Sequence, residues 1–205
     1  MADTERNTLE QIHKAAKAEF LEKGFKSASL RNIVKTAGVT TGAFYGYYKS
    51  KEELFGALVG KQYDVFMKKF KDTQNAFACL CPEDQKRYMG VQSAECMDWM
   101  TDYAYDNFEE FRLLLCCSDG TKYGNMVHEM VEIEISATRS FAKVMESLGN
   151  PAYNVDPMLE HMLVSGMVSA YFEMFIHDMP RENAKEYGRQ LRNFHMAGWK
   201  EIMGF

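Results

Sequence analysis

The sequence has little proline and no long apolar run. Its only four prolines are Pro82, Pro151, Pro157 and Pro180. The stretches between them are rich in Ala, Leu, Met, Glu and Lys, which favour helices. No apolar run approaches the ~20 residues needed to cross a bilayer, and the polar start at residues 1–6 lacks the layout of a signal peptide. We therefore expect an all-α, cytoplasmic protein with no membrane partner.

The cysteines do not form a disulfide framework. Their number, five, is odd, and Cys116 and Cys117 are adjacent, which suits a reducing compartment. Cys79 and Cys81, together with Cys116 and Cys117, leave open a thiol- or metal-sensing site. A single CxC without a second ligand pair is weak support for it, and buried structural thiols are commoner. We predict no metal site and keep a sensing regulator as the alternative.

The charge is unevenly distributed. The net charge of −5 argues against general nucleic-acid binding. Residues 1–70, however, hold twelve Lys or Arg and eight Asp or Glu, an excess of four positive charges, which leaves the other 135 residues with an excess of nine negative charges. This pattern indicates that only the N-terminal part meets phosphate.

The N-terminal part reads as three helices. A capping box at residues 8–11 starts the first helix, which ends at Gly24. Ser29 caps a short second helix, which ends at Gly38. After the turn at Gly38, Thr40 or Thr41 caps a third short helix that reaches about residue 48. Two short helices across a glycine turn form a helix-turn-helix.

The rest of the chain reads as longer helices. A second capping box at residues 50–53 begins a helix that runs towards residue 72. The later breaks are at Asp119-Gly120, Gly149 to Pro151, and Met179-Pro180. They predict helices near 84–106, 108–118, 121–148, 156–179 and 182–203.

The segment 38–55, GVTTGAFYGYYKSKEELF, closely resembles the signature of the TetR family, and the match extends over roughly residues 8–58. The resemblance implies a homodimer with a helix-turn-helix DNA-binding domain at 1–50 and a helical ligand-binding and dimerisation domain at 51–205. It also implies that the last two long helices pair across the dimer. The sequence departs from the family pattern at Thr41, Ala43 and Gly46. These departures affect the predicted recognition of DNA bases and not the predicted fold.

The helical wheel of the third helix places Phe44 and Tyr48 towards the core. Tyr45 and Tyr47 flank them, where their hydroxyls can reach phosphate. A lysine near the start of a helix is unfavourable for the helix dipole unless an anion lies close by. DNA phosphate would be such an anion for Lys49 and Lys51. The predicted DNA contacts are Ser29, Thr40, Thr41, Gly42, Ala43, Tyr45, Gly46, Tyr47, Lys49 and Lys51.

Methionines and aromatic residues concentrate at residues 89–135 and favour an adaptable ligand pocket. We predict pocket residues Met89, Cys96, Met100, Tyr103, Phe111, Tyr123, Met126 and Met130; an ordinary Met-rich core is the alternative. Asp98, Asp102 and Asp106 share one helix face and would attract a cationic ligand, although a solvated acidic face is the better interpretation. The expected inducer is small and apolar or cationic.

Two apolar stripes near the C-terminus predict the dimer interface, because a two-fold operator requires a dimer. Small residues in the first stripe allow a second helix to approach closely. The predicted interface residues are Leu159, Met162, Gly166, Ala170, Leu191, Phe194 and Gly198. The alternative is that these helices close the core of a monomer.

Common catalytic motifs are missing. We find no G-x-S-x-G, P-loop or H-E-x-x-H motif and no repeated Glu-x-x-His pair. We therefore predict no catalytic residues and no cofactor, with a helical cofactor-binding enzyme as a remote alternative. The predicted function is a ligand-responsive transcriptional repressor that binds double-stranded, palindromic operator DNA as a homodimer and is released by a small-molecule inducer.

Overall fold

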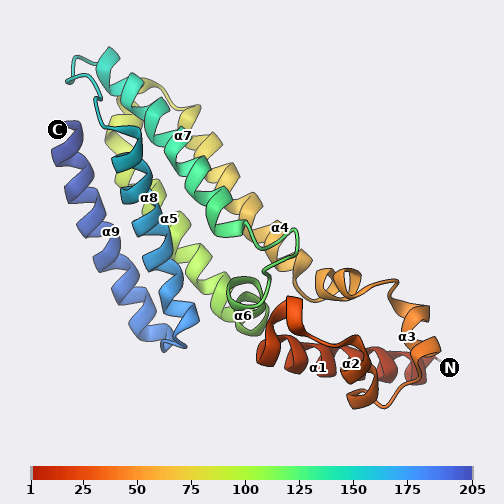
Figure 1. Ribbon diagram of the computed structural model, residues 1–205. Helices are drawn as coiled ribbons and strands as arrows, with labels where there is room; N and C mark the ends of the chain where they lie inside the picture. Colours follow the sequence, from red (N-terminus) through yellow and green to blue (C-terminus); the bar gives the residue numbers. More distant parts are fainter. Residues whose placement is uncertain (1, 205) are drawn as a thin grey trace. The chain divides into compact units, whose positions relative to one another are not determined.

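The computed structural model describes residues 2–204, with side chains from residue 6. Within this range it contains nine helices and no strand (Figure 1). They are α1 (Ala2–Ser27), α2 (Leu30–Thr36), α3 (Thr41–Tyr47), α4 (Lys51–Ala78), α5 (Pro82–Asp106), α6 (Phe108–Cys116), α7 (Met126–Ser147), α8 (Pro157–Ile176) and α9 (Arg181–Met203). The all-α prediction is confirmed.

Two helix starts differ from the sequence-based expectation. Helix α1 begins at Ala2, before the expected capping box, and Gly24 interrupts it with a φ of 69°, the left-handed region that favours glycine. Helix α7 begins at Met126 rather than at residue 121. The Thr121 hydroxyl donates to the Ser118 carbonyl and accepts from the Tyr123 N–H. These local bonds hold a turn in place of the first helical turn.

The chain folds as two compact units. The first comprises residues 1–64 and 107–125, and the second comprises residues 65–106 and 126–205. Helix α4 therefore contributes to both units, and α6 belongs with the N-terminal helices. The functional boundary expected at residue 50 remains a prediction.

The first unit has an aromatic core. Phe20 of α1 meets the ring of Phe55 of α4 edge-on, with 5.1 Å between ring centroids, and Phe25 meets Phe55 in the same way at 5.4 Å. Ile12 of α1 and Ile33 of α2 are also fully buried. Because apolar residues of α1, α2 and α4 share one core, they hold the short helix α3 in a fixed place.

The second unit is a bundle of the later part of α4 with α5, α7, α8 and α9. Phe66 of α4 and Phe172 of α8 lie fully buried with ring centroids 6.1 Å apart. At one end, Phe141, Met145 and Met203 form a small cluster of buried residues. The bundle encloses the cavity described below.

Candidate nucleic-acid interface and ligand cavity

Each short helix of the N-terminal unit starts at a capping side chain. The Ser29 hydroxyl accepts the Asn32 N–H at 3.4 Å, and the Thr40 hydroxyl accepts the Ala43 N–H at 3.1 Å. Thr40, rather than Thr41, is thus the N-cap of α3. The Ser29 N–H donates to the buried carboxylate of Glu19 at 2.9 Å, and this bond is the main reason why the pKa of Glu19 is lowered. Only the hydroxyl of Ser29 therefore remains to meet a phosphate.

Two aromatic residues fix the orientation of α3. Phe44 is fully buried and Tyr48 is 8% exposed, as the helical wheel predicts. The Tyr48 hydroxyl forms a hydrogen bond with Nε2 of His13 on α1. Burial raises the pKa of Tyr48 and lowers that of His13, so both groups are neutral near pH 7. The bond ties the end of α3 to α1 without introducing a charge.

The opposite face of α3 is exposed and nearly free of long side chains. Thr41, Gly42, Ala43 and Gly46 are all exposed. No atom lies within 4 Å of the place where a Cβ on Gly46 would stand. Tyr45, 54% exposed, lies beside this surface, whereas Tyr47 is half-buried. A flat backbone surface of this kind can approach another molecule closely.

The two lysines after α3 have different surroundings. Lys49 has an exposed side chain, while its main-chain N–H donates to Glu53 at 2.6 Å. The Lys51 ammonium group instead donates to the carbonyl oxygens of Phe25 at 2.6 Å and Ala28 at 3.0 Å, and it lies 4.6 Å from the centroid of the Phe25 ring. Lys51 caps the end of α1, so we remove it from the predicted phosphate contacts.

Sequence reasoning missed two basic residues on α2. Arg31 and Lys35 are both exposed, and Lys35 lies in the last turn of the helix. Both stand on the polar side of the apolar pattern formed by Ile33 and Val34. That position was readable from the sequence and indicates a second source of positive charge in the helix-turn-helix.

The second unit contains a cavity of about 210 Å³ lined by side chains from α4, α5, α7, α8 and α9. Of the predicted pocket residues, Met89, Cys96, Met100 and Met130 line it, whereas Tyr103, Phe111, Tyr123 and Met126 do not. Phe111 and Tyr123 are core residues of the first unit. The cavity instead gains Phe70, Phe77 and Trp199 from helices outside the predicted range.

A half-buried carboxyl group faces this cavity. Glu134 of α7 accepts a hydrogen bond of 2.6 Å from the Gln74 side chain of α4. Because the surrounding helices remove much of the water around this carboxyl, desolvation raises its pKa to about 6. The cavity wall thus contains an acid that changes its protonation state close to neutral pH.

The N-terminal unit matches a known family. Residues 12–58 match the model of bacterial regulatory proteins of the tetR family. This stretch of the chain therefore carries the sequence pattern of the TetR-family DNA-binding domain. The match covers the exposed face of α3, its N-cap and the start of α4, as the sequence signature predicted.

Individual relatives resemble part of this chain. An uncharacterised HTH-type transcriptional regulator, YdgC of Bacillus subtilis, is 45% identical over 49 residues, which are 24% of this chain and 25% of the relative. The HTH-type transcriptional repressor NemR of Escherichia coli K12 is 33% identical over 63 residues, 31% of this chain and 32% of the relative. The matched stretches thus span between a quarter and a third of these two relatives.

The fold extends the likeness over most of the chain. A TetR-like transcriptional regulator from Rhodococcus sp. RHA1 superposes with a TM-score of 0.55 at 17% identity and covers 93% of this chain and 96% of its own. At this identity the comparison establishes a shared fold. The helices that follow residue 58 therefore share the fold of that regulator, while most of their side chains differ from it.

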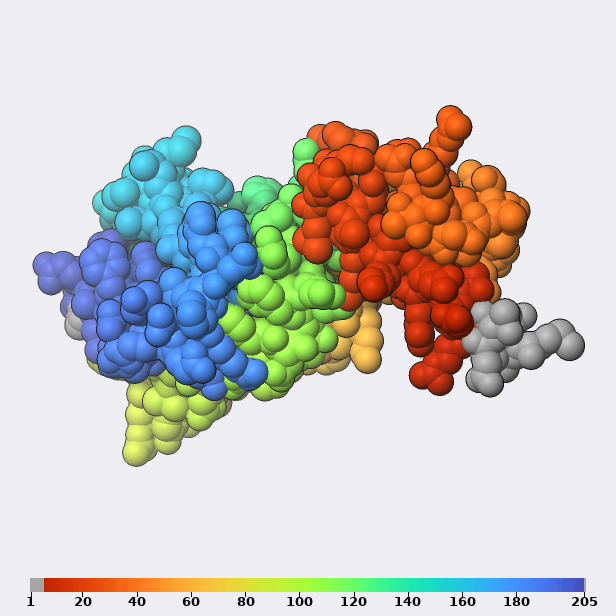
Figure 2. Space-filling model, turned by 90° about the horizontal axis from the view of Figure 1, so that it is seen from below, coloured from red at the N-terminus to blue at the C-terminus, as the bar shows by residue number. Residues whose placement is uncertain are grey.

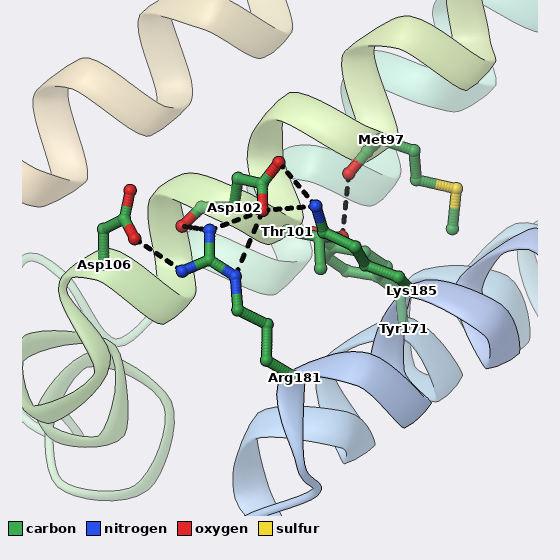
Figure 3. A network of polar contacts seen from close by, with 7 residues as sticks. All are labelled: Met97, Thr101, Asp102, Asp106, Tyr171, Arg181 and Lys185. Atoms are coloured by element: carbon green, nitrogen blue, oxygen red, sulfur yellow. Dashed lines mark hydrogen bonds and ion pairs between the residues drawn. The ribbon is translucent and has the colours of Figure 1, made fainter.

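Aspartates of α5 engage basic residues of α9 (Figure 3). Asp102 accepts from Arg181 and from Lys185, the latter at 2.9 Å, and Asp106 accepts from Arg181 at 2.7 Å. The bonds from Lys185 and Arg181 are the main reason why the pKa of Asp102 is lowered. Asp102 and Asp106 are thus paired with basic residues of the chain, which argues against a cationic-ligand site at this face.

The C-terminal helices expose several large apolar side chains. Figure 2 shows the blue C-terminal segments at the surface of the molecule. Met162 is 63% exposed and Phe194 is 74% exposed. Leu159, Gly166 and Gly198 are exposed as well, and Ala170, Leu191 and Phe194 line one shallow groove. No atom lies within 4 Å of a Cβ built on Gly166 or Gly198. All seven predicted interface residues thus lie at or beside the exposed surface of α8 and α9.

The cysteines are dispersed. Cys79 and Cys81 are exposed in the second unit, while Cys116 and Cys117 end α6 in the first. Burial raises the pKa of Cys117 to about 11, which opposes the thiolate form that a sensor needs. Across the described residues, no three His, Cys, Asp or Glu side chains gather as a metal ion requires. Among the helices described, none has the length and apolar character to cross a membrane.

Proposed function

We propose that this TetR-family chain is a transcriptional repressor that binds operator DNA through α2 and α3 and is released by a small molecule. The observation that carries the proposal is the exposed, nearly side-chain-free face of α3, which Phe44 and Tyr48 hold towards solvent. Such a face suits the major groove, where the second helix of a helix-turn-helix lies.

Base recognition by α3 depends on close approach. The helix offers no Arg, Asn or Gln for bidentate contacts, each of which would supply ~1–3 kcal/mol of discrimination. What remains is contact of Ala43 with a thymine methyl, the hydroxyl of Thr41, and backbone approach at Gly46. We expect much of the specificity to come from DNA shape, with phosphate contacts from Tyr45, Tyr47, Lys49 and the basic residues of α2.

The active form is proposed to be a homodimer built on the exposed face of α8 and α9. Exposed large apolar side chains at Met162 and Phe194 are costly in water. The open backbone at Gly166 and Gly198 lets a second pair of helices pack closely. A two-fold dimer predicts an inverted-repeat operator with half-site centres ~34–36 Å, or a multiple of this, apart.

Release by a ligand is proposed to act through α4. This helix spans both units, and its residues Phe70, Thr73, Gln74 and Phe77 line the cavity. A ligand that prefers one position of α4 shifts the equilibrium between DNA-binding and non-binding states. The coupling expected is ~1–3 kcal/mol, roughly 5–150-fold in operator affinity, and it is reciprocal.

The test begins with selection of binding sites from random double-stranded DNA, followed by footprinting of the selected site. The expected result is an inverted repeat protected at both half-sites, bound by a dimer in light scattering. Loss of binding in a variant with Lys49→Ala and Tyr45→Ala, with the fold retained, would support the assigned interface. Selection of no sequence, or protection of one half-site by a monomer, would contradict the proposal.

A further inference from the structure

Two polar atoms in the wall between α5 and α9 lack partners. Among the described residues, nothing forms a hydrogen bond with Oε1 of Gln92 or with Nη1 of Arg192, and both side chains line the cavity. The Arg192 side chain is 17% exposed, and its Nη1 forms a 3.8 Å ion pair with the exposed Asp98 carboxylate, which is too long for a hydrogen bond. Buried polar groups are normally satisfied, so this pair marks a place for a ligand.

Both side chains line the same cavity, one from α5 and the other from α9. Lys185 contacts Asp102, and Arg192 lies beside Asp98, so α5 and α9 run antiparallel. A Cβ on Gly90 would stand 3.8 Å from the end of the Met196 side chain. In this register Arg192 lies opposite the part of α5 between Gln92 and Asp98. One cavity thus contains both a donor and an acceptor without a hydrogen bond.

The remainder of the cavity suits an apolar tail. Its wall includes Met97, Met130, Phe141 and Trp199, adaptable and polarizable side chains that tolerate varied alkyl groups. Five ionisable residues face it, namely Cys96, Glu134, Tyr171, Arg192 and His195. Burial raises the pKa of Cys96 and Tyr171 and lowers that of His195. Arg192 thus carries a positive charge near neutral pH, and Glu134 carries a negative charge once the pH is above about 6.

We propose that this cavity recognises the acyl head of an amphipathic molecule, a carboxamide or carboxylate whose oxygen accepts a hydrogen bond from Nη1 of Arg192. In a carboxamide, the N–H donates to Oε1 of Gln92, so both unsatisfied atoms gain partners. The alkyl tail lies among the methionines and aromatic rings. The inference rests on the proposed function, in which the same cavity holds the inducer.

The charge of the cavity favours this head over an amine. The fixed positive charge of Arg192 repels an ammonium group, and Asp102 of α5 is engaged by Arg181 and Lys185. Glu134 of α7 disfavours a carboxylate while it is ionised. A neutral carboxamide avoids both repulsions, so it is the better ligand near pH 7.

The test measures binding to the full chain without DNA, by titration calorimetry with octanamide, octanoate and octylamine. We expect octanamide to bind most tightly and octylamine most weakly. Arg192→Met keeps an apolar stem and removes the donor, and it should lower the affinity for octanamide and octanoate roughly tenfold or more. Gln92→Leu should weaken octanamide binding and spare octanoate.

The matched control is Arg189→Met, on the same helix, because Arg189 is exposed and pairs with Glu186. This variant should bind all three probes as the parent does. Failure of octanamide and octanoate to bind at millimolar concentration, stronger binding of octylamine, or Arg192→Met binding like the parent would each overturn the inference. If octanamide binds through Arg192 but does not change the affinity for operator DNA, the proposed release from DNA by a ligand is refuted. The inference about the acyl head then still holds.

Discussion

The hydroxyl of Tyr123 lies directly over Gly60 of α4, and a Cβ on that glycine would stand 2.8 Å from the phenolic oxygen. Gly56, one turn earlier, would place its Cβ 3.1 Å from the same oxygen. The ring also packs edge-on against Tyr63 at 5.2 Å between centroids. The loop after α6 is therefore attached to α4 within the first unit through a glycine surface.

Gly60→Ala should lower the free energy of unfolding, because the new methyl displaces Tyr123. Overpacking costs ~1–3 kcal/mol, against a gain of up to ~1 kcal/mol in helix propensity. In a Tyr123→Phe background the obstructing oxygen is absent, so the same alanine should become neutral or stabilising. Chemical denaturation of the parent, the two single variants and the double variant gives the change in free energy of unfolding for each substitution. If Gly60→Ala destabilises the protein equally with Tyr123 and with Phe at that position, the contact is disproved.

Lys49 and Lys51 should separate DNA binding from stability. Lys49→Ala should weaken binding to all operators about equally and reduce the slope of log affinity against log salt by ~1, with unfolding unchanged. Lys51→Ala removes a charged donor from three carbonyls and should cost ~1.5–3 kcal/mol of stability. The measurements are DNA affinity at several salt concentrations and chemical denaturation, both made on each variant. A loss of stability in Lys49→Ala together with a loss of DNA affinity in Lys51→Ala would contradict the assignment.

Gly46→Ala should impair operator binding without harming the fold. The added methyl meets no atom of the chain and improves helix propensity by up to ~1 kcal/mol, but it would stand between the α3 backbone and the groove. Gel-shift titration should show weaker binding while the melting temperature is retained or raised. Parent-like affinity would mean that α3 does not approach the bases closely.

Gly166→Glu should convert the dimer into a monomer, because it places a charge on the exposed face of α8. Ser136→Glu, at an exposed position of α7, adds the same charge elsewhere and should remain dimeric. Light scattering of both variants is the measurement. A dimeric Gly166→Glu variant would remove the α8 and α9 face from the proposed interface.

Glu134→Gln should stabilise the protein at pH 8 and not at pH 4. The pKa of this carboxyl is raised to about 6 in the folded protein, so its contribution to stability is fully present below its unfolded value near 4.5 and is lost as pH rises through 6. The free energy of unfolding that is lost between low and high pH corresponds to roughly 1–2 kcal/mol. Denaturation against pH checks it, with exposed Glu132→Gln as the control; a pH-independent difference would refute the raised pKa.

Local sequence determined the helices of the N-terminal unit and their family. Capping residues Ser29 and Thr40 and the apolar spacing around Phe44 act within a few residues, so pattern reasoning finds them. The exposed stripe of α8 and α9 was readable for the same reason, because helical periodicity places Gly166 and Phe194 on apolar faces.

Tertiary structure decided what depends on partners distant in the chain. Lys51 resembles a phosphate contact in sequence, yet its ammonium group reaches carbonyls more than twenty residues away. Asp102 is neutralised by Arg181, 79 residues later. The cavity is built by five helices, so its orphaned Arg192 and its raised-pKa Glu134 carry no local signal. Burial and long-range pairing, which arise only when the helices pack, gave these residues their chemistry.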